Sequence, residues 1–224
     1  MASIHETRRQ VYEDKPDDYF KSVRLDIIAD LPAGHKLSLL EIGCGYGATL
    51  AEAKRQGKAA RIAGVEIDPK AAAQARRTVD EIIVGDVELI ELPFAPYSFD
   101  VLILSAVLEH LVDPWQTLKR LHPLLKIGGL IYASSPSVAH ITVLRMLLRN
   151  RWDYAERGRL DRTHLRWFTP ETYCEMVERA GFKVHWVRPV EKLTGKQAVA
   201  DLLTLRRFSH LFTSQIFLKA ERMA

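Results

Sequence analysis

The strongest constraint on the fold is a short apolar run that leads directly into three closely spaced glycines. Residues 38–42 have the pattern of a buried strand, Gly43, Gly45 and Gly47 follow at alternate positions, and residues 48–56 then have helical spacing. Glycine lets the backbone turn tightly and approach a ligand, and the first N–H groups of a helix are free to bind one. The sequence therefore predicts a ligand-binding turn between a strand and a helix.

Apolar runs alternate with helical patterns along the rest of the chain, which is typical of β-α-β units and a parallel sheet. Strands are predicted at residues 38–42, 60–66, 81–84, 99–105, 129–134, 183–187 and 214–220, and helices at 17–29, 48–56, 69–78, 114–125 and 170–180. We predict one α/β domain over residues 1–224, with an N-terminal helix at 17–29 and cover insertions at about 137–169 and 194–210.

Composition limits the function classes. The 224 residues are 47% hydrophobic and 27% charged with a net charge of +4, which fits an ordinary globular protein and gives no sign of a nucleic-acid partner. Cys44 and Cys174 occupy unrelated positions, as a reducing cytosol allows, and indicate no disulfide framework. Residues 1–15 lack an apolar signal segment, and no apolar run is long enough to span a bilayer. We expect a cytoplasmic protein without a transmembrane segment.

The spacing of the three glycines separates this turn from a dinucleotide site. The dinucleotide fingerprint is G-x-G-x-x-G, which disfavours a nicotinamide oxidoreductase here. The run Glu41-Ile42-Gly43-Cys44-Gly45-Tyr46-Gly47 instead resembles E/D-x-G-x-G-x-G, the first motif of class I S-adenosylmethionine-dependent methyltransferases. The resemblance covers about residues 36–135. It implies a Rossmann-like, seven-stranded, mostly parallel sheet with helices on both faces and an antiparallel last strand. S-adenosyl-L-methionine is the implied cofactor, held by Glu41, Gly43, Gly45 and Gly47.

Later motifs follow in the order of this family. Glu66, 19 residues after Gly47, ends a predicted strand and is expected, with Ile67, at the ribose hydroxyls. The resemblance implies that Asp86 and the backbone N–H of Val87 contact the adenine. Ser105, at the end of the fourth strand, is expected beside the methyl group. Two other acids have structural interpretations, Asp68 as a helix cap and Asp100 as a strand-start residue.

Two residues of the predicted first helix extend this comparison. Similar enzymes often place a tyrosine and an arginine near the methionine end of the cofactor, which suggests Tyr19 and Arg24. Arg24 has the geometry to pair with a carboxylate through two hydrogen bonds. A solvated surface arginine is the alternative interpretation.

The segment after the fourth predicted strand contains Glu109 and His110. A similar stretch in ubiquinone-pathway O-methyltransferases reads E-x-x-E-H and is associated with a divalent metal, but Ala106 replaces the first acid here. Because two adjacent ligands make a poor site, we predict no metal site. His110 is a candidate catalytic residue that lines the pocket, with capping or packing as the alternative.

Charged residues gather in a second segment, Asp161-Arg162-Thr163-His164-Leu165-Arg166-Trp167-Phe168-Thr169. It resembles a subset of class I methyltransferases associated with polysaccharide and sugar modification. Loops at this end of a sheet often carry function. We therefore predict that Asp161, Arg162 and Arg166 contact the substrate and that His164 is a general base, with ordering of the loop as its alternative role.

Between Arg145 and Arg166 the chain has seven arginines, three acids and no lysine. Arginine suits bidentate contacts to phosphate or carboxylate, which indicates an anionic acceptor. Since apolar residues 143, 144 and 146–148 lie nearby, an amphipathic cover or a membrane-surface patch stays open.

These motifs together predict an S-adenosylmethionine-dependent enzyme that O-methylates a small or sugar-like acceptor, either anionic or lipid-linked. One alternative is a partner protein that binds the cofactor without turnover. Another is an RNA or protein methyltransferase, although Leu104-Ser105-Ala106-Val107 lacks the Asn-Pro-Pro-Tyr type of motif used on base amines. The sequence makes no prediction of oligomeric state.

Overall fold

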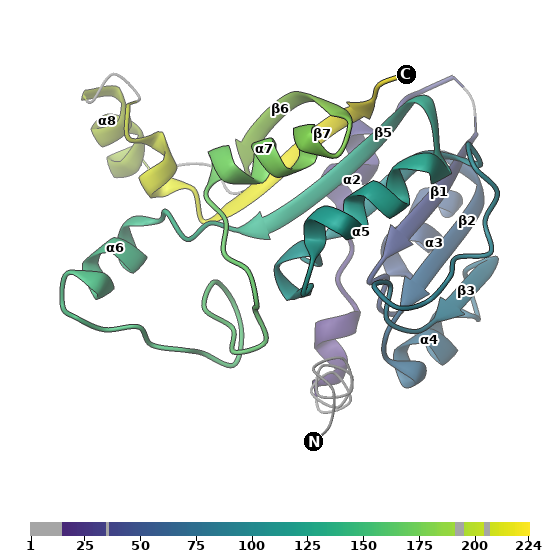
Figure 1. The fold of residues 1–224 in the computed structure, drawn as a ribbon, viewed down its shortest axis with the longest axis horizontal. Helices are drawn as coiled ribbons and strands as arrows, with labels where there is room; N and C mark the ends of the chain where they lie inside the picture. The colour runs from purple at the N-terminus through teal and green to yellow at the C-terminus, as the bar shows by residue number, and fades with distance from the viewer. Residues whose placement is uncertain (1–14, 35, 191–194, 204–206) are drawn as a thin grey trace.

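The centre of the fold is a seven-stranded sheet (Figure 1), seen in a computed structural model that describes residues 15–34, 36–190, 195–203 and 207–224. Its strands are β1 (Leu37–Ile42), β2 (Ala59–Glu66), β3 (Glu81–Val84), β4 (Phe99–Ser105), β5 (Leu125–Pro136), β6 (Phe182–Pro189) and β7 (Gln215–Arg222). They lie in the order β3-β2-β1-β4-β5-β7-β6, and β7 is antiparallel to both of its neighbours. The pairs among β1 to β5 are parallel. The predicted fold class is confirmed.

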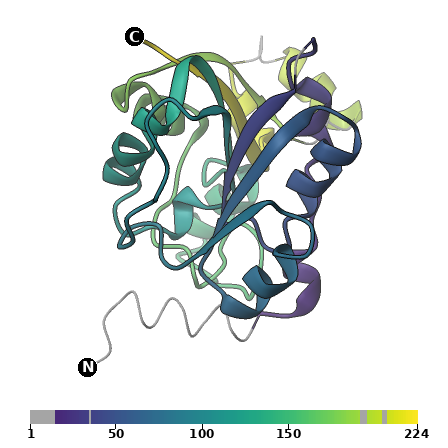
Figure 2. The same ribbon diagram turned by 90° about the vertical axis from the view of Figure 1, so that its right-hand side faces the viewer.

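Helices cover both faces of the sheet because apolar side chains alternate along the strands. In β1, Leu40 and Ile42 join one buried cluster, whereas Leu37 and Leu39 join the other, since successive strand residues point to opposite faces. The first cluster includes residues of α5 (Pro114–Leu121) and α7 (Pro170–Arg179), and the second includes residues of α2 (Leu25–Asp30), α3 (Ala48–Arg55) and α4 (Pro69–Ala75). Figure 2 shows the blue helix α3 and the teal helix α5 on opposite sides of the sheet.

The strand order changes direction at β1. From β1 the chain proceeds to β2 and β3 on one side, and then crosses to β4 on the other side. Open α/β sheets bind ligands at the carboxyl ends of the strands where this change occurs. The glycine turn after β1 lies at this point.

The prediction of one continuous helix at residues 17–29 is wrong. Residues Asp17–Phe20 form a 3₁₀ helix, η1, and α2 begins only at Leu25. The intervening segment is held across the glycine turn, because the Phe20 carbonyl accepts from the Tyr46 N–H at 3.0 Å and the Arg24 N–H donates to Thr49 Oγ1 at 3.2 Å. Bonds to the turn thus replace the helical bonds that the spacing predicts.

Two other predicted boundaries shift for identifiable reasons. The helix predicted at 114–125 ends at Leu121 and passes through the 3₁₀ helix η3 (His122–Leu124), where Pro123 removes a backbone donor. Strand β5 is longer than the predicted 129–134, because it continues through an irregular pairing with β4 near Gly128, whose φ is +77°.

Both acids with structural interpretations have the expected contacts. Asp68 caps α4 by accepting a hydrogen bond from the Ala71 N–H at 2.6 Å. The Asp100 carboxylate accepts from the Ser38 N–H at 2.8 Å and joins the starts of β1 and β4.

The two predicted insertions lie beyond the carboxyl end of β5 (Figure 1). The first contains α6 (Ile141–Leu147), and the second contains α8 (Gly195–Leu203) and the 3₁₀ helix η4 (Ser209–Phe212). Outside the described residues lie 194 and 204–206 of the second insertion. So do residues 1–14 of the segment in which the sequence predicts no signal peptide. None of the helices in the described part of the chain has the length and apolarity needed to cross a membrane.

Candidate active site

The glycine turn has a conformation and a packing that require glycine. Gly43, Gly45 and Gly47 have φ values of +67°, +55° and +72°, in the left-handed region that side chains disfavour. A Cβ atom on Gly45 would lie 2.6 Å from the Phe20 carbonyl oxygen, and one on Gly43 would lie 2.8 Å from Val107 Cγ2. The turn therefore fits closely between η1 and the segment after β4.

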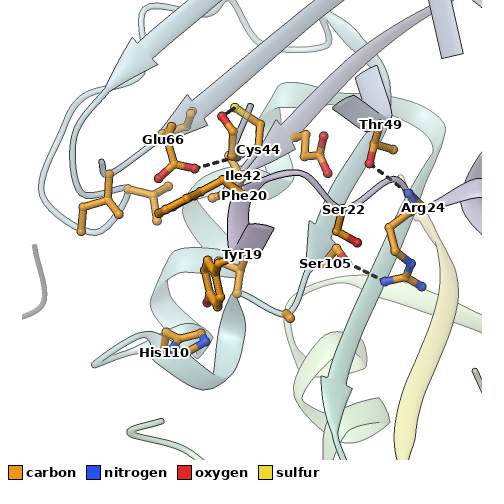
Figure 3. A pocket seen from close by; sticks show the side chains of 18 of the residues that line it. Tyr19, Phe20, Ser22, Arg24, Ile42, Cys44, Thr49, Glu66, Ser105 and His110 are labelled. Carbon is orange, nitrogen blue, oxygen red and sulfur yellow. Dashed lines mark hydrogen bonds between the residues drawn. The ribbon is translucent and has the colours of Figure 1, made fainter. Parts of the chain in front are cut away.

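A cavity of about 350 Å³ opens beside this turn (Figure 3). The predicted cofactor residues that line it are Tyr19, Arg24, Glu41, Gly43, Gly45, Glu66, Ile67, Asp86, Val87 and Ser105. Gly47 is not among the lining residues. It is the N-cap of α3, two residues after Gly45, and a Cβ there would meet Val79 Cγ2 at 2.4 Å. The fold thus brings the motif residues of four strands to one cavity.

Glu66 is fixed in the cavity wall by two backbone donors. Its Oε2 accepts from the Gly45 N–H at 2.7 Å, and its Oε1 accepts from the Asp68 N–H at 2.9 Å. Burial raises the pKa of Glu66, while these N–H groups oppose that rise. Each carboxylate oxygen has two lone pairs, so both oxygens can also accept from ligand hydroxyls.

Glu41 differs from Glu66 because one of its oxygens has no partner. The residue is buried at the end of β1, and its Oε2 accepts no hydrogen bond. Burial raises the pKa of Glu41 to about 8, although the Arg24 guanidinium acts in the opposite direction. An unpartnered buried oxygen facing a cavity is suited to a cationic or N–H donor of a ligand.

The Arg24 side chain is part of the cavity wall and is not the solvated arginine of the alternative interpretation. Its Nε and Nη2 donate to the Asp26 carboxylate at 2.9 and 2.7 Å. Its Nη1 donates to Ser105 Oγ at 2.5 Å and to Ser134 Oγ at 2.7 Å, and its guanidinium lies 4.8 Å from the Phe217 ring centre. Sequence spacing did not indicate Asp26 or Ser134.

Apolar residues form the wall beyond Glu66. Asp86 follows β3, and its Oδ1 accepts from the Glu88 N–H at 3.0 Å, which orients the start of the next segment. Ile67 and Val87 line the same cavity as this acid. A flat apolar ring with polar edges fits such surroundings.

Two histidines meet at the other end of the cavity. His110, in the 3₁₀ helix η2 (Leu108–His110), lines the cavity, and the His164 ring lies behind it with the ring centres 4.7 Å apart. His164 is not a lining residue. Burial lowers the pKa of His110 to about 3 and also lowers that of His164, so both rings are neutral near pH 7.

Glu109 completes a buried group of possible metal ligands with these histidines. One ligand atom each from Glu109, His110 and His164 lies within 4.8 Å of the other two. The prediction of no metal site rested on only two adjacent donors. The fold adds a third from a distant loop.

The three charged residues predicted to contact substrate do not line the cavity. Asp161 is buried and accepts from Lys15 Nζ at 2.8 Å and from the Thr163 N–H at 2.9 Å. Arg162 is exposed, and its Nη2 forms an ion pair with Glu156 Oε2 at 2.9 Å. Arg166 donates to the Val112 carbonyl.

Backbone hydrogen bonds hold the loop that contains residues 161–169 against η2. The N–H groups of Leu165 and Arg166 donate to the Glu109 carbonyl at 2.8 and 3.0 Å. This contact determines which side chains face inward, so His164 points into the protein while Arg162 points to solvent. None of Asp161, Arg162 and Arg166 lies at the cavity, and their contact with the substrate stays a prediction.

Comparison with known proteins adds family information to this geometry. The family model described as methyltransferase domain matches residues 6–187. The ubiquinone biosynthesis O-methyltransferase of Aeromonas salmonicida is 27% identical over 184 residues, which are 77% of this chain and 74% of that protein. The 2-phytyl-1,4-naphtoquinone methyltransferase of Thermosynechococcus vestitus is 27% identical over 172 residues, covering 69% and 75% of the two chains.

A solved structure supports the fold. The S-adenosylmethionine dependent methyltransferase of Mesorhizobium loti superposes with a TM-score of 0.61 at 19% identity, covering 93% of this chain and 99% of that one. This chain spans between about a third and three quarters of the lengths of the curated relatives that it matches. The match over residues 6–187, together with the fold, shows that the chain belongs to the class I S-adenosylmethionine-dependent methyltransferase family.

Proposed function

We propose that this protein transfers a methyl group from S-adenosylmethionine to a hydroxyl group of a small-molecule acceptor. The observation that carries the proposal is the order of residues along one cavity. Asp86 follows β3, and Glu66, Glu41 and Ser105 lie at or near the carboxyl ends of β2, β1 and β4. These four strands are adjacent in the order β3-β2-β1-β4. The acids therefore run along the sheet edge toward the hydroxyl and imidazole groups of Ser105 and His110.

The residues present fit an adenosyl sulfonium ligand. The Glu66 carboxylate is oriented to accept from two ribose hydroxyls, and Ile67 and Val87 provide apolar walls for the adenine. The unpartnered Oε2 of Glu41 fits the cationic amino group of the methionine portion. Arg24, beside Ser105, provides the positive charge that a ligand carboxylate requires.

The main task of the chain in this reaction is to align the acceptor oxygen with the methyl group. S-adenosylmethionine supplies a methyl group that is already activated by the positive charge on its sulfur. Holding the acceptor oxygen in line with that methyl group can contribute about 7–11 kcal/mol to lowering the barrier. The close packing of η1 over the turn, with Gly45 in contact with Phe20, supports a role of η1 in excluding water.

His110 and His164 are the residues that we propose as catalytic at the acceptor end. Their neutral rings each have an unprotonated nitrogen that can accept a hydrogen bond from a hydroxyl group, although a pKa of about 3 makes the His110 ring a weak base. His110 lines the cavity and meets the acceptor, whereas His164 acts through its contact with His110.

The acceptor class has two lines of support. Two relatives are named as methyltransferases of quinone biosynthesis or of a naphthoquinone, which supports a small molecule. The local similarity of residues 161–169 to enzymes of sugar modification makes sugar-like hydroxyl compounds the second group to screen.

We also propose that the acceptor is lipid-linked and is met at an anionic membrane surface. Leu144, Leu147 and Leu148 at α6 are 41%, 52% and 78% exposed, and Arg145 and Arg149 lie between or beside them. Exposed leucines next to cations fit the interface of an anionic bilayer.

Calorimetry with S-adenosylmethionine tests the core of the proposal. We expect the native chain to bind the cofactor and Glu66→Ala to bind it at least about tenfold more weakly, a difference of about 1.4 kcal/mol. Mass spectrometry of quinone-like, sugar and nucleotide-sugar compounds then identifies the methylated product. Unchanged affinity in Glu66→Ala would remove the ribose assignment, and binding without any product would favour a partner protein that only holds the cofactor.

A further inference from the structure

Three buried side chains at the acceptor end form a group that the sequence did not predict. Glu109 and His110 are neighbours in η2, while His164 is 54 residues further along the chain. One ligand atom of each lies within 4.8 Å of the others, and all three side chains are buried. The loop contacts on the Glu109 carbonyl hold the two segments together.

The Glu109 carboxylate is the strongest sign that something is bound here. The residue is only 1% exposed, and neither carboxylate oxygen accepts a hydrogen bond of ordinary geometry. No hydrogen-bond partner is found for the hydroxyl groups of Ser135, which lowers the pKa of Glu109, and of Tyr173, whose own pKa Glu109 raises. A buried carboxylate is costly unless it is paired with a cation or coordinates a metal.

The two imidazoles have the orientation that metal ligands commonly have. His164 Nδ1 lies 3.2 Å from the Arg159 carbonyl oxygen, and His110 Nδ1 lies 3.2 Å from the Thr163 carbonyl oxygen. A neutral ring that donates its Nδ1–H to a carbonyl carries its lone pair on Nε2. Such donation to a backbone carbonyl is the usual way in which a metal-binding histidine is oriented.

We propose that Glu109, His110 and His164 bind one divalent transition-metal ion, with Zn²⁺ as the reference ion. Two imidazoles and one carboxylate are a ligand set of catalytic zinc sites, which keep a further position open. Magnesium and calcium prefer ligand sets made of oxygen atoms, so the histidines disfavour them.

The position of His110 connects this site to the proposed function, on which the catalytic part of the inference rests. Because His110 lines the cavity, an ion held by these residues would lie near the acceptor end. An acceptor hydroxyl bound to the ion would lose its proton more readily. With an ion bound, the two histidines would act by holding it and would not accept the proton themselves.

The test uses the full chain, stripped of metal and titrated with Co²⁺ alone, whose visible absorption reports coordination by nitrogen and oxygen ligands. We expect one equivalent of Co²⁺ to bind and to be displaced by Zn²⁺. Glu109→Gln and His164→Asn should each weaken binding by at least about 10–100-fold, the range that even indirect disruption of a metal site produces. His185→Asn is the matched control, because its imidazole pairs with Glu221 on the exposed side of β6.

Either of two results would overturn the proposal. Failure to bind Co²⁺ or Zn²⁺, or binding that is equally strong in Glu109→Gln and His164→Asn, would leave the site without support. The circular dichroism of each variant shows whether it is folded. Calorimetry with S-adenosylmethionine separates this inference from the proposed function, because cofactor binding should persist in Glu109→Gln whether or not the metal is held.

Discussion

The Gly45 N–H donates to Glu66 Oε2 at 2.7 Å and so connects the turn after β1 to the acid that ends β2. The same glycine contacts Phe20 from the other side, since its Cα hydrogen occupies the space that a Cβ would need. One residue thus positions both the acid that we propose for ribose binding and the η1 segment above the cavity.

Substitution of Gly45 by alanine should therefore have two separable effects. A left-handed φ of +55° costs an alanine about 1–2 kcal/mol, and the 2.6 Å approach of its Cβ to the Phe20 oxygen adds to that loss. We expect Gly45→Ala to lower the urea midpoint and to weaken cofactor binding at least about tenfold, or 1.4 kcal/mol.

Gly57→Ala is the control for Gly45→Ala. Gly57 has a similar φ of +74°, but a Cβ there would meet nothing within 4 Å. Gly57→Ala should lower the urea midpoint, because alanine disfavours the left-handed backbone conformation. It should leave the affinity for the cofactor unchanged. Equal cofactor affinities in the two variants would contradict the role of the Phe20 contact.

Glu41 should make the stability of the ligand-free protein depend on pH. Its folded-state pKa of about 8 lies above the ordinary 4.5, so the native state holds the proton more tightly than the unfolded chain does. The stabilisation is fully present below pH 4.5 and is lost as the pH rises to about 8. Glu41→Gln should reduce this loss, as urea unfolding across that pH range would measure.

Glu52→Gln is the control, because the pKa of Glu52 is shifted in the opposite direction from that of Glu41. Hydrogen bonds from Arg55 and Gln56 lower the pKa of Glu52 to about 2, so its contribution to stability is lost only as the pH falls below 4.5. It should leave the slope between pH 4.5 and 8 unchanged. An identical slope in native protein and Glu41→Gln would contradict the burial argument for Glu41.

The position of Glu66 and Asp86 at one cavity was predictable because each lies at or near a strand end. Glu66 is the last residue of β2 and Asp86 lies two residues after β3, and parallel strands bring their carboxyl ends to one edge of the sheet. The pattern of strands alone therefore places these acids in one cavity.

The remaining contacts depend on tertiary geometry that spacing does not contain. Arg24 reaches Ser134, 110 residues away, only because β5 lies beside β4. His164 meets His110 because the loop backbone bonds to the Glu109 carbonyl. The charge of Arg162 gave no indication of whether the loop would turn it toward the cavity or toward solvent.

Membrane contact through α6 predicts a dependence on lipid charge. The native chain should sediment with phosphatidylglycerol vesicles and much less with phosphatidylcholine vesicles. Leu147→Ser combined with Leu148→Ser should weaken that binding at least about tenfold, since burial of one leucine contributes about 1.5–3 kcal/mol.

Ile127→Ser is the control for the leucine pair, because Ile127 is 63% exposed near the start of β5, at the other end of that strand from α6. It should bind vesicles as the native chain does. Equal sedimentation with both lipids, or no effect of the leucine substitutions, would exclude this surface as the membrane contact.

Arg24→Lys tests whether cofactor binding needs the planar guanidinium of Arg24 or only its positive charge. Lysine retains the charge but lacks the planar group that bonds to two partners at once. Arg24→Lys should lose the paired bonds to Asp26 and the bond to Ser134, weakening cofactor binding at least about tenfold, or 1.4 kcal/mol. Arg55 makes the same paired contact with Glu52 on the surface, so Arg55→Lys should change stability by less than about 0.5 kcal/mol and leave cofactor affinity unchanged. Calorimetry and urea unfolding of both variants measure these effects, and full cofactor affinity in Arg24→Lys would show that charge alone suffices at this position.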